Sequence, residues 1–350
     1  MTSNAPRISE SGAPSMEHLV TAVRRGLGLS DTARISLQEE ADLANINYVY
    51  RVETPDRTLY LKVVPERPKR FPVRLPRERV FSEAEALRRF RSLADGLVAI
   101  PEVLFVDSQE MALAMSDVGV GRQVLFGILS EQFNLLEEQA NALGLSLGKV
   151  HSGTRGSGSL RPATEEAMLR KIVFDGLLAP GAMQAFPDAW AAVSAEMQSH
   201  TECLIHADLW SKNLLVKRGE PIALVDFEGV CYGDPAFDLG TLSAVALLPA
   251  LEKLELLPAA LSFIDRLLES WKSSCRSDDW AEQVLPRTFR ATATFLATRA
   301  FGPFAYVMSE AARRRIGTLA RSLASDPPPQ SVGAFQSVIH RHIALSSLTG

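Results

Sequence analysis

Residues 204–240 read LIHADLWSKNLLVKRGEPIALVDFEGVCYGDPAFDLG. Two short apolar runs, Leu214–Val216 and Ile222–Val225, lie on either side of the segment KRGEP, whose Gly219 and Pro221 are typical of a turn. Apolar runs separated by a turn of this length predict a β-hairpin. It is the most clearly defined strand pair in the second half of the chain.

Polar side chains stand at the ends of these two predicted strands, where an apolar hairpin has no need for them. They are Asp208, Asn213, Asp226 and Glu228. Pairing across the turn would bring Asn213 and Asp226 together, with Asp208 in the adjoining loop. Such oxygen ligands suit Mg²⁺, and a carboxylate outside the metal shell can accept the proton of an attacking hydroxyl. Each residue alone is equally typical of a turn, but their joint occurrence favours a chemical role.

The composition indicates a folded protein without a general affinity for nucleic acid. The chain has 350 residues, of which 46% are apolar and 22% charged, with a formal net charge of −4. A duplex-binding protein normally carries a basic surface, which this balance does not supply. Cys203, Cys231 and Cys275 lack the paired spacing of a zinc site and suit a reducing compartment. We therefore expect a cytoplasmic protein that binds no nucleic acid.

The distribution of apolar residues predicts neither a signal peptide nor a membrane span. The N-terminal MTSNAPRISESGAPS is polar and lacks the apolar core of a signal peptide. The longest apolar region, Leu242–Ile264, is interrupted by prolines and charged residues and is unsuited to crossing a bilayer. No membrane is expected as a partner.

Hydrophobic patterning divides the chain into three parts. Residues 1–34 predict a polar lead and a helix. Residues 35–119 predict a small α+β lobe, with strands in INYVYRVE, TLYLKVV and the segment 97–119, and a helix over 77–93. Residues 120–350 predict a mainly helical lobe around the hairpin. The helices are expected over 122–151, 162–198, 240–274, 278–324 and 331–347.

The spacing His206-x-Asp208-x4-Asn213, followed by the hairpin and Asp226, resembles the aminoglycoside phosphotransferase and choline kinase group. These enzymes are small-molecule relatives of the protein kinases. The later GDPAFDLG resembles the usual continuation of the group, in which an aspartate such as Asp238 holds the catalytic loop. The resemblance implies a two-lobed protein-kinase-like fold, with a small antiparallel-sheet N-lobe and a large, mainly helical C-lobe. It also implies ATP and Mg²⁺ as cofactors and transfer of the γ-phosphoryl group to a hydroxyl of a small molecule.

The same resemblance implies roles for the polar residues of the hairpin. Asp208 is expected to be the catalytic base, and Asn213 and Asp226 are expected to hold Mg²⁺. Glu228 takes the place of a third carboxylate that binds a second ion in some members. Ala207 departs from the pattern, because glycine is usual at this position.

A kinase-like N-lobe needs a lysine on a central strand, paired with a glutamate on a helix, to bind the nucleotide phosphates. Lys62 lies inside the apolar run LYLKVV, which would not bury an ammonium without a partner. Glu83 shares a helical stripe with Val80 and Leu87. A lysine and a glutamate that both lie in apolar patterns each need a partner of opposite charge, so the two are predicted to pair. The alternative is a lysine that extends to solvent and a glutamate at the rim of the helix.

Further nucleotide contacts are implied by the resemblance. No glycine-rich loop precedes the strands, and Asn45 and Asn47 of ADLANINYVYRV are expected to form a turn over the phosphates in its place. Met115 and Asp117, in the segment MSDVG, fit the crossover between lobes, where backbone groups receive adenine.

A narrower resemblance concerns the acceptor, the small molecule that receives the phosphoryl group. The segments LANINYVYRV, RERVFSEAEAL and AARRRIGTLA are similar to parts of 5-methylthioribose kinase, where an arginine pair in the last segment helps to hold the sugar. The matching positions are Arg314 and Arg315, and Trp210 is expected to line the same pocket. The chain is short for that family, and residues 313–315 also fit a solvated basic turn of helix.

A thiosugar such as 5-methylthioribose is therefore the first acceptor to consider, and an aminoglycoside, choline or homoserine is the alternative. A nucleotide-binding pseudokinase that acts as a partner protein is a rival, although it would not need the full set of candidate residues. A protein kinase is another rival, but the eleven residues between Asp226 and Asp238 leave no room for a peptide-docking loop. The expected partner is a small hydroxylated molecule, and a homodimer is left open.

Overall fold

The computed structural model describes residues 14–40, 46–67, 69, 74–125, 133–156, 158–325 and 327–348, without the side chains of 133–138 and 344–348. The predicted lead of residues 1–13 and Asn45 lie outside the described residues. The chain divides into two compact units. The first contains Met1–Ser92 with Ile100–Val120, and the second contains Leu93–Ala99 with Gly121–Gly350.

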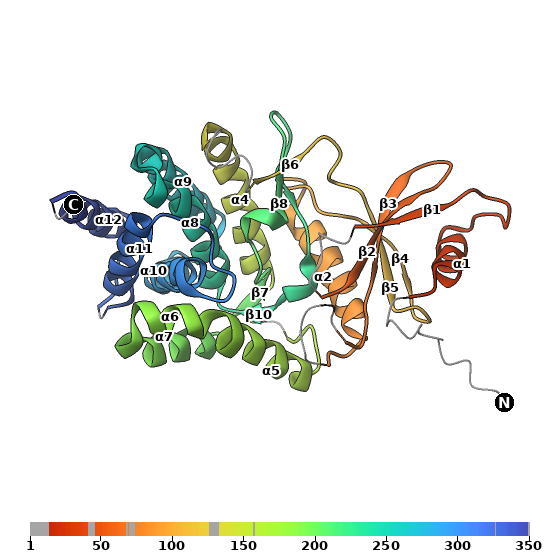
Figure 1. Ribbon diagram of the computed structural model, residues 1–350, viewed down its shortest axis with the longest axis horizontal. Helices are drawn as coiled ribbons and strands as arrows, with labels where there is room; N and C mark the ends of the chain where they lie inside the picture. The colour runs from red at the N-terminus through yellow and green to blue at the C-terminus, as the bar shows by residue number, and fades with distance from the viewer. Residues whose placement is uncertain are drawn as a thin grey trace. The chain divides into compact units, whose positions relative to one another are not determined.

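The first unit is built on a five-stranded antiparallel sheet in the order β1-β2-β3-β5-β4 (Figure 1). The strands are β1 (Ser36–Glu39), β2 (Tyr48–Glu53), β3 (Thr58–Val63), β4 (Val103–Asp107) and β5 (Ala112–Ser116). The predicted strand pairs β2–β3 and β4–β5 are confirmed. The prediction missed β1, whose sequence SLQE has little apolar alternation and which, among the described strands, pairs only with β2.

Two helices pack on this sheet. Leu19 and Val23 of α1 (Met16–Leu27) share one core cluster with Leu59 and Leu61 of β3. Successive side chains of a strand point to opposite faces, so Lys62 points away from this cluster. It contacts α2 (Arg79–Ala94), which therefore covers the other face. The alternation of β3 thus turns its lysine towards α2.

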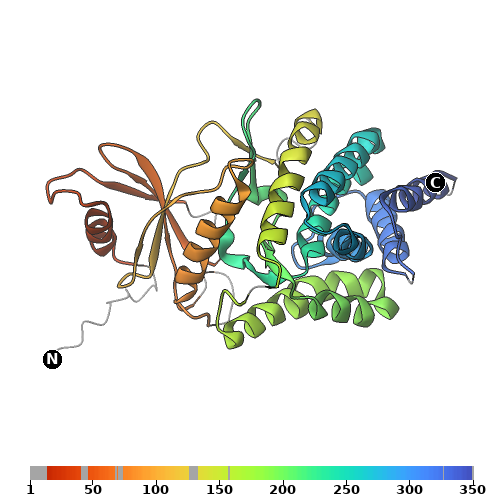
Figure 2. The same ribbon diagram turned by 180° about the vertical axis from the view of Figure 1, so that it is seen from behind.

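The second unit is mainly helical (Figures 1 and 2). Helix α4 (Phe133–Gly153) packs along α9 (Leu257–Ser274), and α8 (Pro235–Glu252) packs along α10 (Asp278–Phe301). A glycine allows α4 to lie close to α9, because a Cβ on Gly144 would lie 2.4 Å from the carbonyl oxygen of Leu267. The remaining helices are α5 (Ala163–Lys171), the π-helix η1 (Ile172–Leu178), α6 (Ala179–Ala185), α7 (Pro187–Ser199), η4 (Leu254–Leu256), α11 (Glu310–Ala324) and α12 (Val332–Leu348).

Several predicted helices are shorter than expected. The helix predicted over 278–324 stops at Phe301, because Gly302 and Pro303 follow, and resumes only at Glu310. The helix predicted over 240–274 is divided at Lys253. The prediction of a helix from residue 122 was wrong at its start, where β6 (Gln123–Val124) forms a strand. A local apolar period does not show where a turn interrupts it.

The predicted hairpin is present. Strand β8 (Leu214–Val216) pairs with β9 (Ala223–Leu224), and β6 adds a third strand. Strands β7 (Cys203–Ile205) and β10 (Cys231–Gly233) form a separate antiparallel pair. Short 3₁₀ segments η2 (Ser211–Asn213) and η3 (Phe227–Gly229) connect these elements. Among the described residues, no helix is both long and apolar enough to cross a membrane.

Candidate active site

The loop after β7 carries Asp208 and is held in place by Asp238. Asp238 is buried in the first turn of α8, and its carboxylate accepts hydrogen bonds from the backbone N–H groups of His206 and Ala207, at 2.8 and 2.9 Å. Ala207 has a φ of 63°, in the left-handed region that residues other than glycine seldom adopt. The two charge-assisted bonds offset a strain of roughly 1 kcal/mol. They therefore fix the backbone that leads into Asp208.

A buried chain of hydrogen bonds continues from Asp238 into the helices. Nε2 of His151 lies 3.2 Å from Oδ2 of Asp238, and Nε1–H of Trp271 donates to Nδ1 of His151 at 3.0 Å. Because Nδ1 accepts, the proton of the neutral ring is on Nε2, which donates to Asp238. These hydrogen bonds hold Asp238 in place through His151 of α4 and Trp271 of α9. No sequence pattern singles out Trp271.

The structure brings Asp208, Asn213 and Asp226 together. Nδ2 of Asn213 donates to Oδ2 of Asp208 at 2.7 Å and to its carbonyl oxygen at 2.9 Å. The backbone N–H of Val225 donates to the carbonyl of Asn213 at 3.1 Å, which extends the β8–β9 pairing and brings Asp226 next to Asn213. Asn213 thus turns its amide nitrogen towards Asp208. Within the described part of the chain, no donor reaches its Oδ1.

The electrostatics of the loop favour a proton acceptor that titrates near neutrality. Burial, followed by the negative charge of Asp226, raises the pKa of Asp208 from 3.8 to about 6. Arg299 and the hydrogen bond from Asn213 act in the opposite direction. A carboxyl group with this pKa suits general-base catalysis, because it is ionised at pH 7 and more basic than an ordinary aspartate.

The same residues also offer oxygen ligands for Mg²⁺. Among the described residues, no three His, Cys, Asp or Glu side chains gather into a metal-binding group of their own. The carboxylate of Asp226 and Oδ1 of Asn213 supply two hard oxygen donors, which fits Mg²⁺ when phosphate oxygens complete its shell. Glu228 lies in η3, where its carbonyl accepts a hydrogen bond from Arg161. Its predicted role at a second ion stays a prediction.

In the first unit, Lys62 and Glu83 form a buried ion pair. Nζ of Lys62 lies 2.8 Å from Oε1 of Glu83, and the side chains are 6% and 3% exposed. Lys62 lies opposite Val49 of β2 and Leu113 of β5, hence on the middle strand of the sheet. The predicted pairing of the lysine with a helix carboxylate is thus present, and its predicted role in phosphate binding stays a prediction. The alternative of a lysine extending to solvent is wrong.

The other predicted nucleotide residues make local contacts. Asn47 is buried, and its Oδ1 accepts a hydrogen bond from Nη2 of Arg79 at 2.9 Å, which ties it to α2. This side chain is therefore held in the interior, and its predicted place in a turn over the phosphates stays a prediction. Met115 lies in β5 opposite Tyr60. Oδ1 of Asp117 accepts the N–H of Gly119 at 2.7 Å, which stabilises the turn after β5.

Trp210, which is predicted to line the acceptor pocket, packs against an aromatic ring and an arginine of α10. It is buried, packs edge-on against Phe295 at 5.4 Å between ring centroids, and carries the guanidinium of Arg299 over its ring at 3.7 Å. Arg299 lies in the last turn of α10, and Tyr306 lies 5.2 Å from the same guanidinium. The sequence analysis missed Arg299. The available signal is one arginine in the otherwise apolar and small-residue stretch ATATFLATRAF.

The predicted arginine pair of the acceptor site lies elsewhere. Arg314 is exposed and pairs with Glu310 at 2.6 Å on the same helix. Nη1 of Arg315 donates to the carbonyl of Leu251 at 3.0 Å, near the end of α8. Asp238 lies near the start of that helix, about 20 Å away at 1.5 Å per residue. The structure thus places Arg314 and Arg315 away from Asp208. The contact of Arg315 holds α11 to α8, whereas the ion pair of Arg314 stays within α11.

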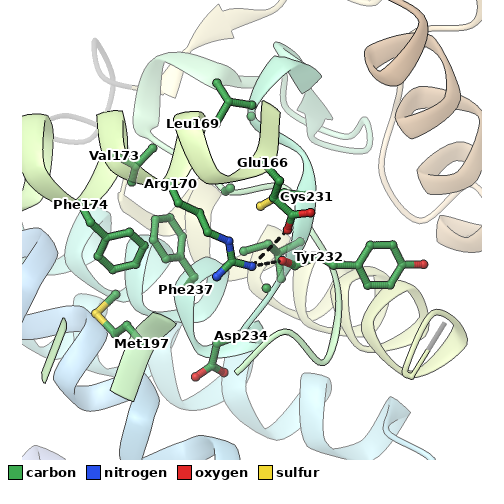
Figure 3. A pocket seen from close by; sticks show the side chains of 14 residues that line it. Glu166, Leu169, Arg170, Val173, Phe174, Met197, Cys231, Tyr232, Asp234 and Phe237 are labelled. Atoms are coloured by element: carbon green, nitrogen blue, oxygen red, sulfur yellow. Dashed lines mark hydrogen bonds and ion pairs between the residues drawn. The ribbon is translucent and has the colours of Figure 1, made fainter. Parts of the chain in front are cut away.

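A cavity of about 90 Å³ adjoins the loop (Figure 3). It is mainly apolar and lies among α5, η1 and β10, with Ala207 and Gly229 also in its wall. Arg170 extends along it and donates to Glu166 at 3.1 Å and to the carbonyl of Tyr232 at 2.9 Å. The ring of Tyr232 points away from the cavity, so only its backbone contributes polar contacts there.

Comparison with known proteins identifies a family. The model of the phosphotransferase enzyme family matches residues 39–257. No curated protein matches the chain. Among solved structures, the chain is similar to an ethanolamine kinase from Plasmodium vivax, with 12% identity, a TM-score of 0.50, and coverage of 97% of this chain and 91% of that one.

Two further structures are more distant in shape. A microcompartment-associated aminopropanol kinase has 17% identity, a TM-score of 0.47, and coverage of 94% and 99%. A thermostable variant of the aminoglycoside phosphotransferase APH(4)-Ia, solved with AMP-PNP and hygromycin B, has 14% identity, a TM-score of 0.42, and coverage of 93% and 97%. The match to the Plasmodium vivax enzyme is consistent with the predicted kinase-like fold.

Proposed function

The chain belongs to the phosphotransferase enzyme family and is a small-molecule kinase, and we propose that Asp208 is the general base of its reaction. The reaction transfers the γ-phosphoryl group of ATP to a hydroxyl of a small molecule. The hydroxyl oxygen forms the new bond to phosphorus, its proton passes to Asp208, and the bond from the γ-phosphorus to the bridging oxygen breaks to release ADP. The approach of Asp208, Asn213 and Asp226 is the observation that supports this proposal most strongly.

The surrounding residues position the base. Asn213 donates to Oδ2 of Asp208 and leaves Oδ1 of that carboxylate to accept the proton of the acceptor. Asp238 stabilises the left-handed backbone at Ala207, which sets the direction of Asp208. Misplacement of a base by about 1 Å can lower a rate a hundredfold, so these contacts matter for catalysis.

Two groups of residues are proposed to bind the phosphates of ATP. Lys62, oriented by Glu83, is proposed to bind the nucleotide phosphates. Asp226 and Asn213 would hold Mg²⁺, with Glu228 as the candidate ligand for a second ion. When bound, Mg²⁺ neutralises charge on the phosphate oxygens. Adenine is proposed to bind the backbone around Met115 and Asp117.

The acceptor is proposed to be a small hydroxylated molecule. The resemblance of sequence segments favours a thiosugar such as 5-methylthioribose, but Arg314 and Arg315 give this choice no structural support. Choline, homoserine and aminoglycosides are the alternatives. A screen of ADP release with these acceptors tests the activity directly.

Asp208→Asn tests the base. Asparagine can still accept the hydrogen bond from Asn213 but cannot take a proton, so kcat should fall by about a hundredfold or more. The nucleotide Kd should not change, since the base contacts the acceptor. Steady-state ADP release and nucleotide titration measure both, with the exposed Asp188→Asn as the matched control. Turnover within about tenfold of the wild type would remove Asp208 from this role.

A further inference from the structure

Arg299 is a buried arginine that pairs with no carboxylate of the described residues. It is 9% exposed, and within the described residues its guanidinium makes one long hydrogen bond, from Nη1 to the carbonyl of Phe304 at 3.4 Å. Its Nε is buried and has no acceptor. Arg290 of the same helix differs in having a carboxylate partner, because it pairs with Glu196 at 2.9 Å. Arginine is rarely buried alone, because removal of its charge from water costs free energy.

Arg299 lies beside the proposed base. Its guanidinium stacks on Trp210, which follows Asp208 by two positions in the chain, and Tyr306 lies on it as well. The charges of Arg299 and Asp208 shift the pKa of each other, yet no ion pair joins these two described residues. An arginine that served only to orient Asp208 would donate to it directly. Apart from the long bond to Phe304, the donors of Arg299 thus lie near the proposed base without an acceptor among the described residues.

Packing alone does not account for a charge at this position. An apolar side chain such as methionine would fill the space between Trp210 and Tyr306 without the desolvation cost of a cation. A planar guanidinium has five N–H donors in a fixed fork that matches a carboxylate or a phosphate. The ring of Trp210 packs against that fork, with its centroid 3.7 Å from the central carbon of the guanidinium. An oxyanion on the ligand would pair donors that are otherwise unsatisfied.

We propose that Arg299 binds the acceptor, and that the acceptor carries an oxyanion, a carboxylate or a phosphate, in addition to the hydroxyl that is phosphorylated. The inference rests on the proposed role of Asp208. Choline or an aminoglycoside would place a second positive charge beside the buried guanidinium, which is unfavourable. A neutral thiosugar would compensate the charge of Arg299 less well.

Small alcohols that differ in charge test this proposal on the wild-type protein. The set consists of γ-hydroxybutyrate, its neutral amide, aminobutanol and glycerol phosphate. ADP release gives kcat/KM for each alcohol, and calorimetry in the presence of ADP gives its binding separately. We expect an anionic compound to be favoured over the amide by about tenfold to a hundredfold, with aminobutanol the poorest. Comparison of γ-hydroxybutyrate with glycerol phosphate distinguishes carboxylate from phosphate.

Variants identify the residue responsible. Arg299→Met removes the charge but keeps an unbranched side chain on Trp210, so the preference for the anion should disappear. Arg299→Lys keeps the charge but loses the fork, so part of the preference should remain. Arg290→Met, in the same helix, is the matched control and should retain the full preference.

The outcomes separate the two proposals. If the wild type shows the same kcat/KM and the same binding for γ-hydroxybutyrate, glycerol phosphate and the neutral amide, the proposed role of Arg299 is overturned. The same holds if the wild type binds none of them. An anion preference that survives in Arg299→Met overturns it as well. Transfer to choline, an aminoglycoside or methylthioribose without an advantage for anions overturns the inference but leaves the kinase activity intact. Anion binding that depends on Arg299 but gives no ADP release supports the anion site and contradicts the role of Asp208.

Discussion

Backbone conformation at single residues explains part of the candidate site. Ala207 and Asp226, at the two ends of the segment that carries Asp208 and Asn213, have φ values of 63° and 65°. Aspartate tolerates the left-handed region better than most residues, while alanine depends on its surroundings. At Ala207 the surroundings are the two hydrogen bonds to Asp238, which explains why alanine is accepted where the family usually has glycine. Strain of this kind commonly marks functional positions.

Asp226→Asn tests the metal site while keeping the backbone, because asparagine also tolerates a positive φ. The variant loses one charged oxygen, so the tightening of ATP binding by Mg²⁺ should weaken by about tenfold or more. ATP affinity without Mg²⁺ should not decrease. Titration of nucleotide with and without Mg²⁺ measures both, with Asp188→Asn as the control. If the metal dependence of the variant equals that of the wild type, Asp226 is only a strand-end residue.

At the scale of elements, the contact between α8 and α10 joins two parts of the site. Helix α8 carries Asp238, which holds the loop, and α10 carries Arg299. The helices approach closely at Gly240, where an added Cβ would lie 2.5 Å from Cβ of Ala291 and 2.9 Å from the N atom of Thr292. The backbone of α10 cannot yield as a flexible side chain would. The spacing of the two helices therefore depends on one glycine.

Gly240→Ala should separate these helices. We expect a loss of about 1 to 3 kcal/mol in the free energy of unfolding, as for other overpacked interiors. The value of kcat should also fall, since Asp238 and Arg299 shift relative to each other. Denaturant unfolding and steady-state kinetics measure the two effects. Gly176→Ala is the matched control, because its Cβ meets nothing within 4 Å. A stable and fully active Gly240→Ala would show that α10 adapts without effect on the site.

At the scale of the whole molecule, each compact unit has its own interior. In the first unit, α1 is attached to the sheet by apolar contacts and by an ion pair between Arg25 and Asp107 of β4. Asp107 is buried and also accepts the N–H groups of Gln109 and Glu110, at 2.9 and 3.0 Å. Burial tends to raise its pKa, but the bonds from Arg25 and from the two backbone groups prevail and lower it. The stability of this unit should therefore depend on pH.

Asp107→Asn tests that dependence. A group whose pKa is lower in the folded state stabilises it above the unfolded pKa, near 3.9, and this contribution is lost as the pH falls through the folded value. At pH 7 the variant should be about 1 to 2 kcal/mol less stable, because Arg25 is half exposed and its pair is partly screened. The difference should shrink below about pH 4. Denaturant unfolding at several pH values measures it, with the exposed Asp56→Asn as the control. A difference that stays constant with pH contradicts the ion-pair explanation.

Much of the candidate site is determined by residues close together in the sequence. The hairpin brings Asn213 to Asp226 because two apolar runs surround one turn, and this needs no knowledge of other elements. The pairing of Lys62 with Glu83 is also predictable, because each charge lies in an apolar pattern and needs a partner. The family assignment follows from the same residues and agrees with the matched model.

Only the tertiary structure decided which distant side chains meet at the loop. Arg299 and Trp271 are far from Asp208 in the sequence, and their positions depend on how α9 and α10 pack, which glycines and side-chain volumes control. For the same reason, Arg315 contacts Leu251 at the end of α8 and not the acceptor site. Periodicity shows which face of a helix is buried, but it does not show which neighbour that face meets. The sequence thus determined the proposed base, the candidate metal ligands and the lysine pair, whereas helix packing determined the side chains beside the proposed base.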